Sequence, residues 1–278
     1  MRILQISDFH LRGDGNLSFQ VVDTAEYLRK TQEHLQHVFS LPNQKPDLIA
    51  VTGDIADSGD EHAYSMVYEA LSGFGVPVFA VPGNHDRRDR MRRLLPDWTV
   101  ENPQTAPYLC YAVREKDFHL VFMDSMSPGS HSGHIPEVCA AWLDKELQEH
   151  QGIPTLIFMH HPPFITGMGA MDEPYENREI LRSVIKKAPW VRLCCGHMHR
   201  PIFTVWAGVP CVTAPAASMQ IELDFSVQGG DTFRMETPGY LLHDFEDGQW
   251  NTHVCQIYSP AKFDGPYPFV GKVNPTED

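Results

Sequence analysis

Five short apolar runs of this chain are each followed directly by polar residues of the kinds that bind metal ions or catalyse reactions. The runs lie at Ile3–Ile6, Asp47–Thr52, Val76–Val81, Thr155–Met159 and Trp190–Cys195. Their length and apolar character are typical of strands that are buried between two layers. Open α/β sheets bind their ligands at the carboxyl ends of such strands. The pattern therefore predicts an α/β fold with its site at the strand ends.

Amphipathic stretches between the runs predict helices that alternate with the strands. We expect helices at Val21–Phe39, Asp60–Ser72, Glu137–His150 and Asn177–Lys187, and further strands at Leu109–Val113 and His119–Asp124. After residue 200 the chain is β-rich, with expected strands at Ile202–Trp206, Val209–Thr213, Gln220–Val227, Tyr240–Glu246 and Trp250–Ile257. Gly229–Gly230 and Asp247–Gly248 are expected hairpin turns, and the tail from Ser259 is expected to be irregular. We divide the chain into a core at residues 1–213 and a β-rich segment at residues 214–278 that completes it.

The formal net charge of -14 disfavours some classes of partner. Bulk nucleic acid would be repelled, whereas a small anion can still bind where divalent metals reverse the local field. No apolar run approaches the ~20 residues that span a bilayer, and the first residues do not form a secretory signal. We therefore expect no membrane partner and a cytoplasmic location. The six cysteines are scattered without a CxxC pair and are expected to be reduced.

The first two polar blocks contain carboxylates that can meet at an ion. Asp8 and His10 stand two residues apart, so both side chains can converge on one metal. Gly53 lets the backbone turn sharply close to an ion, and the two oxygens of Asp54 suit a bridge between two metals. Taken alone, each block also fits an ordinary turn or a helix cap.

The next two blocks follow the third and fourth strands. Asn84 can offer a neutral carbonyl oxygen to a metal, and His85 lies beside it without having to coordinate. His160 and His161 are adjacent imidazoles that point in different directions, so we expect only one of them to be a ligand.

The fifth block contains His197 and His199, which alternate on an extended segment and so project to the same side. This arrangement suits one metal ion or two neighbouring ones. Together the blocks supply oxygen and nitrogen donors and no thiolate. Such a set suits Mn, Fe or Zn rather than a cysteine-rich structural zinc.

In this order, the motifs Asp-x-His, Gly-Asp, Gly-Asn-His-Asp, His and Gly-His-x-His resemble those of the calcineurin-like metallophosphoesterase superfamily. The resemblance covers residues 1 to 245 and is closest to the bacterial cyclic-nucleotide and glycerophosphodiester phosphodiesterases. Pro238-Gly239-Tyr240 resembles the cyclic-AMP branch. The resemblance implies a four-layer α-β-β-α sandwich with two metal ions at the strand ends. It also implies a homo-oligomer built through the C-terminal β segment.

By position in these motifs, the resemblance assigns seven metal ligands. The first metal ion would take Asp8, His10, Asp54 and His199, and the second would take Asp54, Asn84, His160 and His197. Asp54 would bridge the pair, and His160 is preferred to His161 by family position alone.

The resemblance also assigns the residues that meet the substrate. Asn84 and His85 are expected to bind it, and His85 is the expected catalytic residue because it matches a histidine that contacts the phosphate or the leaving group. Asp57 stands where some members have an aspartate that orients this histidine, although close relatives have other residues there.

The expected function is hydrolysis of a small phosphodiester, foremost a 3′,5′-cyclic nucleotide such as cAMP. Two metal ions would hold the phosphoryl oxygens and lower the pKa of a bound water. The resulting hydroxide would attack phosphorus while His85 assists the leaving group. A glycerophosphodiester phosphodiesterase or a phosphatase of broad specificity is the alternative.

A metal-binding module without catalysis is disfavoured, because no ligand position is substituted and His85 is present. The loop Phe164–Asn177, with Met168, Met171 and Tyr175, is expected to shape the pocket together with the segment after residue 213.

Overall fold

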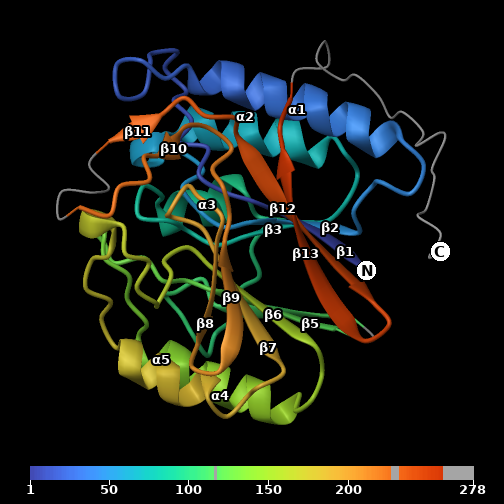
Figure 1. Cartoon of the computed structure of the whole chain (residues 1–278), viewed down its shortest axis with the longest axis vertical. Helices are drawn as coiled ribbons and strands as arrows, with labels where there is room; N and C mark the ends of the chain where they lie inside the picture. The colour runs from blue at the N-terminus through green and yellow to red at the C-terminus, as the bar shows by residue number, and fades with distance from the viewer. Residues whose placement is uncertain (116–117, 227–231, 259–278) are drawn as a thin grey trace, which may run out of the picture.

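Two β-sheets form the centre of the computed structural model, which describes residues 1–115, 118–226 and 232–258 (Figure 1). The first sheet has the strand order β13-β12-β1-β2-β3. Its strands are β1 (Arg2–Ile6), β2 (Leu48–Val51), β3 (Val78–Ala80), β12 (Gly239–Glu246) and β13 (Gln249–Gln256). Because β1, β2 and β3 are parallel, their carboxyl ends lie at one edge, whereas β12 pairs with β1 in the antiparallel sense.

The second sheet has the strand order β4-β5-β6-β7-β9-β8. Its strands are β4 (Tyr111–Glu115), β5 (Phe118–Met123), β6 (Thr155–Met159), β7 (Val191–Cys195), β8 (Ile202–Trp206) and β9 (Val209–Thr213). The four inner strands are parallel, and β4 and β8 are antiparallel edge strands. The carboxyl ends of β6 and β7 therefore also lie at one edge.

The connections between the strands contain five α-helices among the described residues. They are α1 (Thr24–Ser40), α2 (Glu61–Ser72), α3 (Arg88–Leu94), α4 (Glu137–Glu149) and α5 (Arg178–Ile185). Short 3-10 turns occur at Asp57–Gly59 and Gly169–Met171, and a small hairpin joins β10 (Gln220–Ile221) to β11 (Phe233–Arg234).

Three apolar cores alternate with the two sheets. Leu4 and Ile6 of β1 pack with α1 and α2, whereas Ile3 faces the second sheet. In β6, Ile157 packs with α4 and α5, and Leu156 faces the first sheet. Helices, first sheet, second sheet and helices thus follow one another through the molecule (Figure 1). Strands that are covered on both faces explain the uninterrupted apolar runs of the sequence.

The mixed α/β fold predicted from the sequence is confirmed, and the differences are local. The first helix begins at Thr24 rather than at Val21, because the Asp23 side chain accepts a hydrogen bond from the Glu26 amide at 2.9 Å and caps the helix there. Helix α3 was not predicted, because its seven residues are too few to show a periodicity and only Met91 among them is buried.

The strand predicted at Gln220–Val227 was wrong in length, since β10 ends at Ile221. The Asp224 carboxylate accepts hydrogen bonds from the amide and hydroxyl of Ser226, and this local turn ends the extended backbone. The turn at Asp247–Gly248 joins β12 to β13 as expected, with positive φ at both residues.

Two expectations concern residues outside the described ranges, namely the Gly229–Gly230 turn and the irregular tail from Ser259. The division at residue 213 stays a prediction. All six cysteines are unpaired. Among the described residues, no helix has the length and apolar character needed to cross a membrane.

Candidate metal centre

The carboxyl ends of β1, β2, β6 and β7 meet at one place between the sheets, and the predicted ligand residues follow them. Six of the seven predicted ligands are buried there; they are Asp8, His10, Asp54, His160, His197 and His199. Asn84, in the loop after β3, is half-buried. The structure therefore brings together side chains that lie up to 191 residues apart in sequence, from Asp8 to His199.

Glycines let the strand ends approach this closely. A Cβ atom on Gly83 would lie 2.2 Å from Asp54 Oδ1, and one on Gly196 would lie 2.2 Å from Ser7 Oγ. Gly53 has a φ of +92°, and a Cβ atom there would lie 2.6 Å from His160 Nδ1. Any side chain at these positions would push the ligand residues apart.

The backbone of the ligand residues themselves is unusual. Five of the seven have φ in the left-handed region, where side chains other than glycine rarely lie; they are Asp8 (59°), His10 (45°), Asp54 (50°), His197 (69°) and His199 (52°). Conformations of this kind are costly and gather at functional sites. The fold thus holds these side chains in positions that local preference alone would not give.

Asp8, His10 and His199 form the first group of donors. The Nε2 atoms of His10 and His199 lie 3.0 Å apart, and Asp8 Oδ1 lies 3.4 Å from His199 Nε2. Asp8 Oδ1 is buried and has no hydrogen-bond partner in the described structure. A buried carboxylate oxygen without a donor is costly unless a cation accompanies it.

Asp54, His160 and Asn84 form the second group. Asp54 Oδ2 lies 3.3 Å from His160 Nε2 and 3.5 Å from His10 Nε2, so this one oxygen faces both groups. Asn84 Oδ1 lies 3.1 Å from His160 Nε2. The other carboxylate oxygen of Asp54 accepts a hydrogen bond from the His85 amide at 2.9 Å, which fixes the carboxylate in its place.

Backbone carbonyl groups set the orientation of two imidazoles. His160 Nδ1 lies 2.7 Å from the carbonyl oxygen of Thr52, and His199 Nδ1 lies 2.9 Å from that of Met219. Each Nδ1 therefore carries a proton and donates it, so Nε2 is the nitrogen directed into the site, and it can coordinate a metal ion once the ring is neutral. This is the usual outer hydrogen bond of a metal-binding histidine, so the donor set fits a pair of metal ions.

Electrostatics agree with this reading. Burial lowers the pKa of His10 and of His197 to about 3, so both imidazoles are neutral and can coordinate. Burial also acts against a charged His160, but the negative charge of Asp54 outweighs it and raises the pKa of His160 to about 9. The space between Asp54 and His160 therefore favours positive charge.

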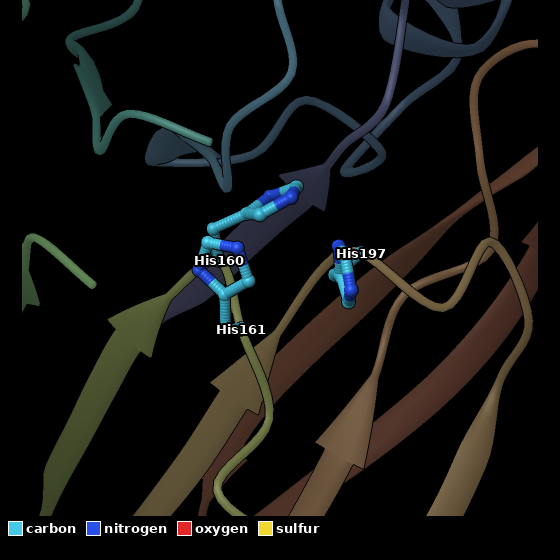
Figure 2. Close-up of side chains that lie close together, drawn as sticks. All are labelled: His160, His161 and His197. Carbon is cyan, nitrogen blue, oxygen red and sulfur yellow. The ribbon is translucent and has the colours of Figure 1, made fainter. Parts of the chain in front are cut away.

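His160, His161 and His197 lie side by side at the ends of β6 and β7 (Figure 2). The ring planes of His160 and His161 are 86° apart, as expected for adjacent residues that point in different directions. One ring nitrogen of His160 and one of His161 nevertheless each lie within 4.8 Å of a ring nitrogen of His197. The Ser125 hydroxyl holds His161 Nδ1 at 2.9 Å, and His161 Nε2 is buried without a hydrogen-bond partner in the described structure.

His85 lies beside the donors and faces the cavity rather than joining them. Its Nδ1 atom is 3.3 Å from Asp57 Oδ1, and its ring centroid is 4.6 Å from that of His10. Arg12 lies 3.5 Å from the other oxygen of Asp57. Burial acts against the charged imidazole of His85, but Asp57 and Asp54 outweigh it and raise its pKa. His85 therefore keeps a proton more readily than a free histidine.

A second cluster lies away from this site and is formed by His119 on β5, Glu146 on α4 and His150 directly after α4. Arg114 Nη2 lies 2.7 Å from Glu146 Oε1, so this carboxylate already has its cation. The cluster is best explained as a partly buried ion pair.

A cavity of about 290 Å³ opens onto the donors. Five of the lining side chains are apolar, and the others are polar. The lining residues are His10, Phe19, Asp54, Asn84, His85, His131, Met171, His197, His199, Met219, Ile221, Thr232 and Phe233.

Of the three residues that the sequence predicted to shape the pocket, only Met171 lines the cavity. Met168 is buried in a small apolar cluster with Met198, and Tyr175 packs against Gly133. The segment after residue 213 contributes to the wall, as expected.

Phe19 and His131 were not predicted. Phe19 lies in a turn without Gly or Asn at its central positions, so the sequence gives no turn signal there. His131 hydrogen-bonds to Asn84 Nδ2 at 3.0 Å from an irregular loop, and, unlike the predicted ligand histidines, it does not directly follow a predicted strand.

Comparisons with known proteins agree with this geometry. The family model for calcineurin-like phosphoesterases matches residues 1–201. A protein of Arcobacter nitrofigilis named probable glycerophosphodiester phosphodiesterase GpdQ is 33% identical over 98% of both chains. The 3′,5′-cyclic adenosine monophosphate phosphodiesterase CpdA of Escherichia coli K12 is 29% identical over 92% of this chain and 90% of that one.

Among solved structures, the purple acid phosphatase PPD1 of yellow lupin has the same fold. Its TM-score is 0.62 at 14% sequence identity, and the match covers 93% of this chain and 52% of the lupin chain. The matched family model covers all five strand-end motifs, and the donors that follow them converge in space as a binuclear metal family requires. The chain belongs to the calcineurin-like phosphoesterase family.

Proposed function

We propose that this metal-dependent phosphodiesterase hydrolyses small phosphodiesters, foremost 3′,5′-cyclic nucleotides such as cAMP, at a centre of two metal ions. The observation that carries the proposal is the position of Asp54 Oδ2. This oxygen lies between His10 Nε2 and His160 Nε2, which belong to the two separate groups of donors. A carboxylate placed in this way can be shared by two cations.

The ligand sets proposed for the two ions extend the two groups, with Asp54 added to the first and His197, whose ring centroid lies 5.1 Å from that of His160, added to the second. The first ion would be held by Asp8, His10, Asp54 and His199, and the second by Asp54, Asn84, His160 and His197. Oxygen and nitrogen donors of this kind suit Mn, Fe or Zn. When bound, such a pair lowers the pKa of a water molecule and offsets the negative charge of the phosphoryl oxygens. This explains how a chain of net charge -14 binds an anion.

The chain's own residues orient the substrate and move a proton. His85 lines the cavity with its Nδ1 atom toward Asp57, so its Nε2 atom is the one that can donate to a phosphoryl or leaving-group oxygen. Asp57 acts as a positioning residue, because it holds the imidazole and supports its charged form. Asn84 borders the same space and is proposed to contact the substrate as well as a metal ion.

Two kinds of substrate are supported by relatives. The Escherichia coli relative is named for cyclic AMP and the Arcobacter relative for glycerophosphodiesters. The neighbouring rings of Phe19 and Phe233 in the cavity wall favour a substrate with a flat aromatic group, and this leads us to place cyclic nucleotides first. Glycerophosphodiesters are the second candidate, and a phosphatase of broad specificity is the third.

A substrate panel with Mn-loaded enzyme tests the proposal. It would contain cAMP, glycerophosphoethanolamine, and an aryl phosphate as its monoester and as its diester. We expect cAMP to give the highest kcat/KM and the aryl diester to exceed the monoester. A higher kcat/KM with glycerophosphoethanolamine than with cAMP would make glycerophosphodiesters the proposed substrates instead. Turnover of the monoester alone would overturn both.

Two expectations about the cellular setting also remain proposals. Leu223, Phe225 and Met235 of the segment after residue 213 are exposed apolar residues, which supports an oligomer contact there. We keep the cytoplasm as the proposed location.

A further inference from the structure

The turn that carries Phe19 is built in an unusual way. The amides and carbonyls of Ser18 and Val22 exchange two hydrogen bonds of 2.9 Å, and both residues are fully buried. Between them, Phe19 and Gln20 have φ of 48° and 65°. Two successive positive φ values are typical of turns that contain Asn and Gly, and a phenylalanine in this conformation is an outlier.

The same turn is tied to the metal centre. The Ser18 hydroxyl donates to the carbonyl oxygen of His10 at 3.2 Å and lies 3.5 Å from Asp57 Oδ2. The base of the turn is therefore fixed relative to the ligands, whereas half of the Phe19 side chain is exposed at its tip. The fold thus holds an aromatic ring in a strained position without burying it fully, and such strain is characteristic of residues with a functional role.

The ring of Phe19 lies at the outer wall of the cavity. Its centroid is 6.2 Å from that of His10 on the inner side and 5.5 Å from that of Phe233 on the outer side. Met219 and Ile221 are further apolar lining residues and are buried. Among the described lining residues there is no lysine or arginine, so the two aromatic rings of Phe19 and Phe233 are the flat surfaces that a ligand meets on this side.

We propose that Phe19, with Phe233 beside it, stacks against the nucleobase of the substrate and thereby makes the enzyme prefer nucleotides to diesters that have no base. The inference rests on the proposed function, since it assigns part of the same cavity to one part of that substrate. The Phe19 ring lies 6.2 Å from the ring of His10, so it is close enough to the donors to meet a base attached to a phosphate held there. Base–aromatic stacking tolerates any nucleobase, because every base has a flat π-face.

The test compares two substrates that differ only in the base. They are cAMP and methyl ribofuranoside 3′,5′-cyclic phosphate, measured with Mn-loaded enzyme. For Phe19→Gly we expect KM for cAMP to rise about tenfold, within the range that stacking on an aromatic side chain contributes. KM for the base-free diester and kcat for both should change less than about twofold, and Phe19→Tyr should behave like the unmodified protein.

Phe19→Gly also separates this role from a purely structural one. Glycine relieves the positive φ, so the melting temperature should stay the same or rise while discrimination between the substrates is lost. Phe203→Ala is the matched control, because Phe203 is similarly exposed but lies on β8, and it should change neither KM. Light scattering at the assay concentrations shows whether Phe19→Gly alters the oligomeric state.

The outcomes distinguish the two proposals. An unchanged KM for cAMP, or equal losses with both substrates, would overturn the role of Phe19 and leave the phosphodiesterase assignment standing. A change of oligomeric state that accounts for the loss would assign Phe19 to a subunit contact and overturn the inference. Failure of the unmodified enzyme to hydrolyse cAMP while it cleaves the base-free diester would contradict the proposed substrate itself.

Discussion

The cavity has an inner half, at the proposed metal ligands, and an outer half, at Phe19 and Phe233, and the two are built from different kinds of structure. The inner half consists of buried side chains that follow parallel strands and are tied together by short polar contacts. The outer half comes from irregular pieces, namely the Phe19 turn, the 3-10 turn at Gly169–Met171 and the β10–β11 hairpin. Under the proposed function, the chemistry belongs to the part built on strand ends and the choice of substrate to the part built on loops, a common division of roles in enzymes. Changes in the inner half should therefore alter kcat, and changes in the outer half should alter KM.

The largest effect is expected for His85→Ala, which removes the proposed proton donor from the inner half. We expect kcat to fall about 10²- to 10⁴-fold, as is usual for loss of a general acid. Elemental analysis should find the same metal content as in the unmodified protein, since His85 lies beside the donors and is not proposed as a ligand. Loss of metal would make His85 a ligand instead.

Gly83→Ala tests whether the inner half depends on close packing of the strand ends. The new methyl group would lie 2.2 Å from Asp54 Oδ1, so the proposed bridging carboxylate has to move. We expect kcat to fall about 10- to 100-fold, since small displacements of catalytic groups are costly, together with a lower melting temperature. Gly73→Ala is the control, because its closest neighbour would be 3.3 Å away and its φ is ordinary. Equal effects of Gly83→Ala and Gly73→Ala would show that the close approach of Gly83 to Asp54 does not matter for activity.

Asp57→Asn keeps the shape of the side chain that faces His85 but removes its charge. The carboxylate contributes to the raised pKa of His85, so its loss should lower kcat by about tenfold and leave KM for cAMP within twofold. A rise in KM with constant kcat would show that Asp57 contributes to binding rather than to the position of His85.

The smallest effect is expected for Met171→Ala in the outer half. Met171 lines the cavity without a polar contact to the donors, and its shortening should raise KM for cAMP only two- to fivefold, as expected when a few apolar contacts are lost. Steady-state kinetics would test this. A fall in kcat of more than tenfold would contradict the claim that residues of the outer half affect KM rather than kcat.

The sequence revealed the inner half far better than the outer half, for a physical reason. Each ligand block follows a buried strand, and parallel strands end at one edge, so the positions of Asp8, Asp54 and His197 in the sequence already imply that they meet. Their left-handed φ values could not be foreseen, since tertiary packing imposes them. Phe19 could not be predicted either, because its turn contradicts ordinary turn chemistry. Met168 and Met171 look alike in sequence, and only the packed structure separates the buried one from the one in the cavity.

The central claim is that Asp54 serves two metal ions at once. Its most direct test is the metal content of purified protein, measured by elemental analysis for the unmodified chain, Asp54→Ala and His199→Ala, with circular dichroism to verify folding. We predict two metal equivalents per chain in the unmodified protein, one in His199→Ala, and fewer than one in Asp54→Ala with loss of activity. A folded Asp54→Ala protein that keeps two equivalents and full activity would contradict the account.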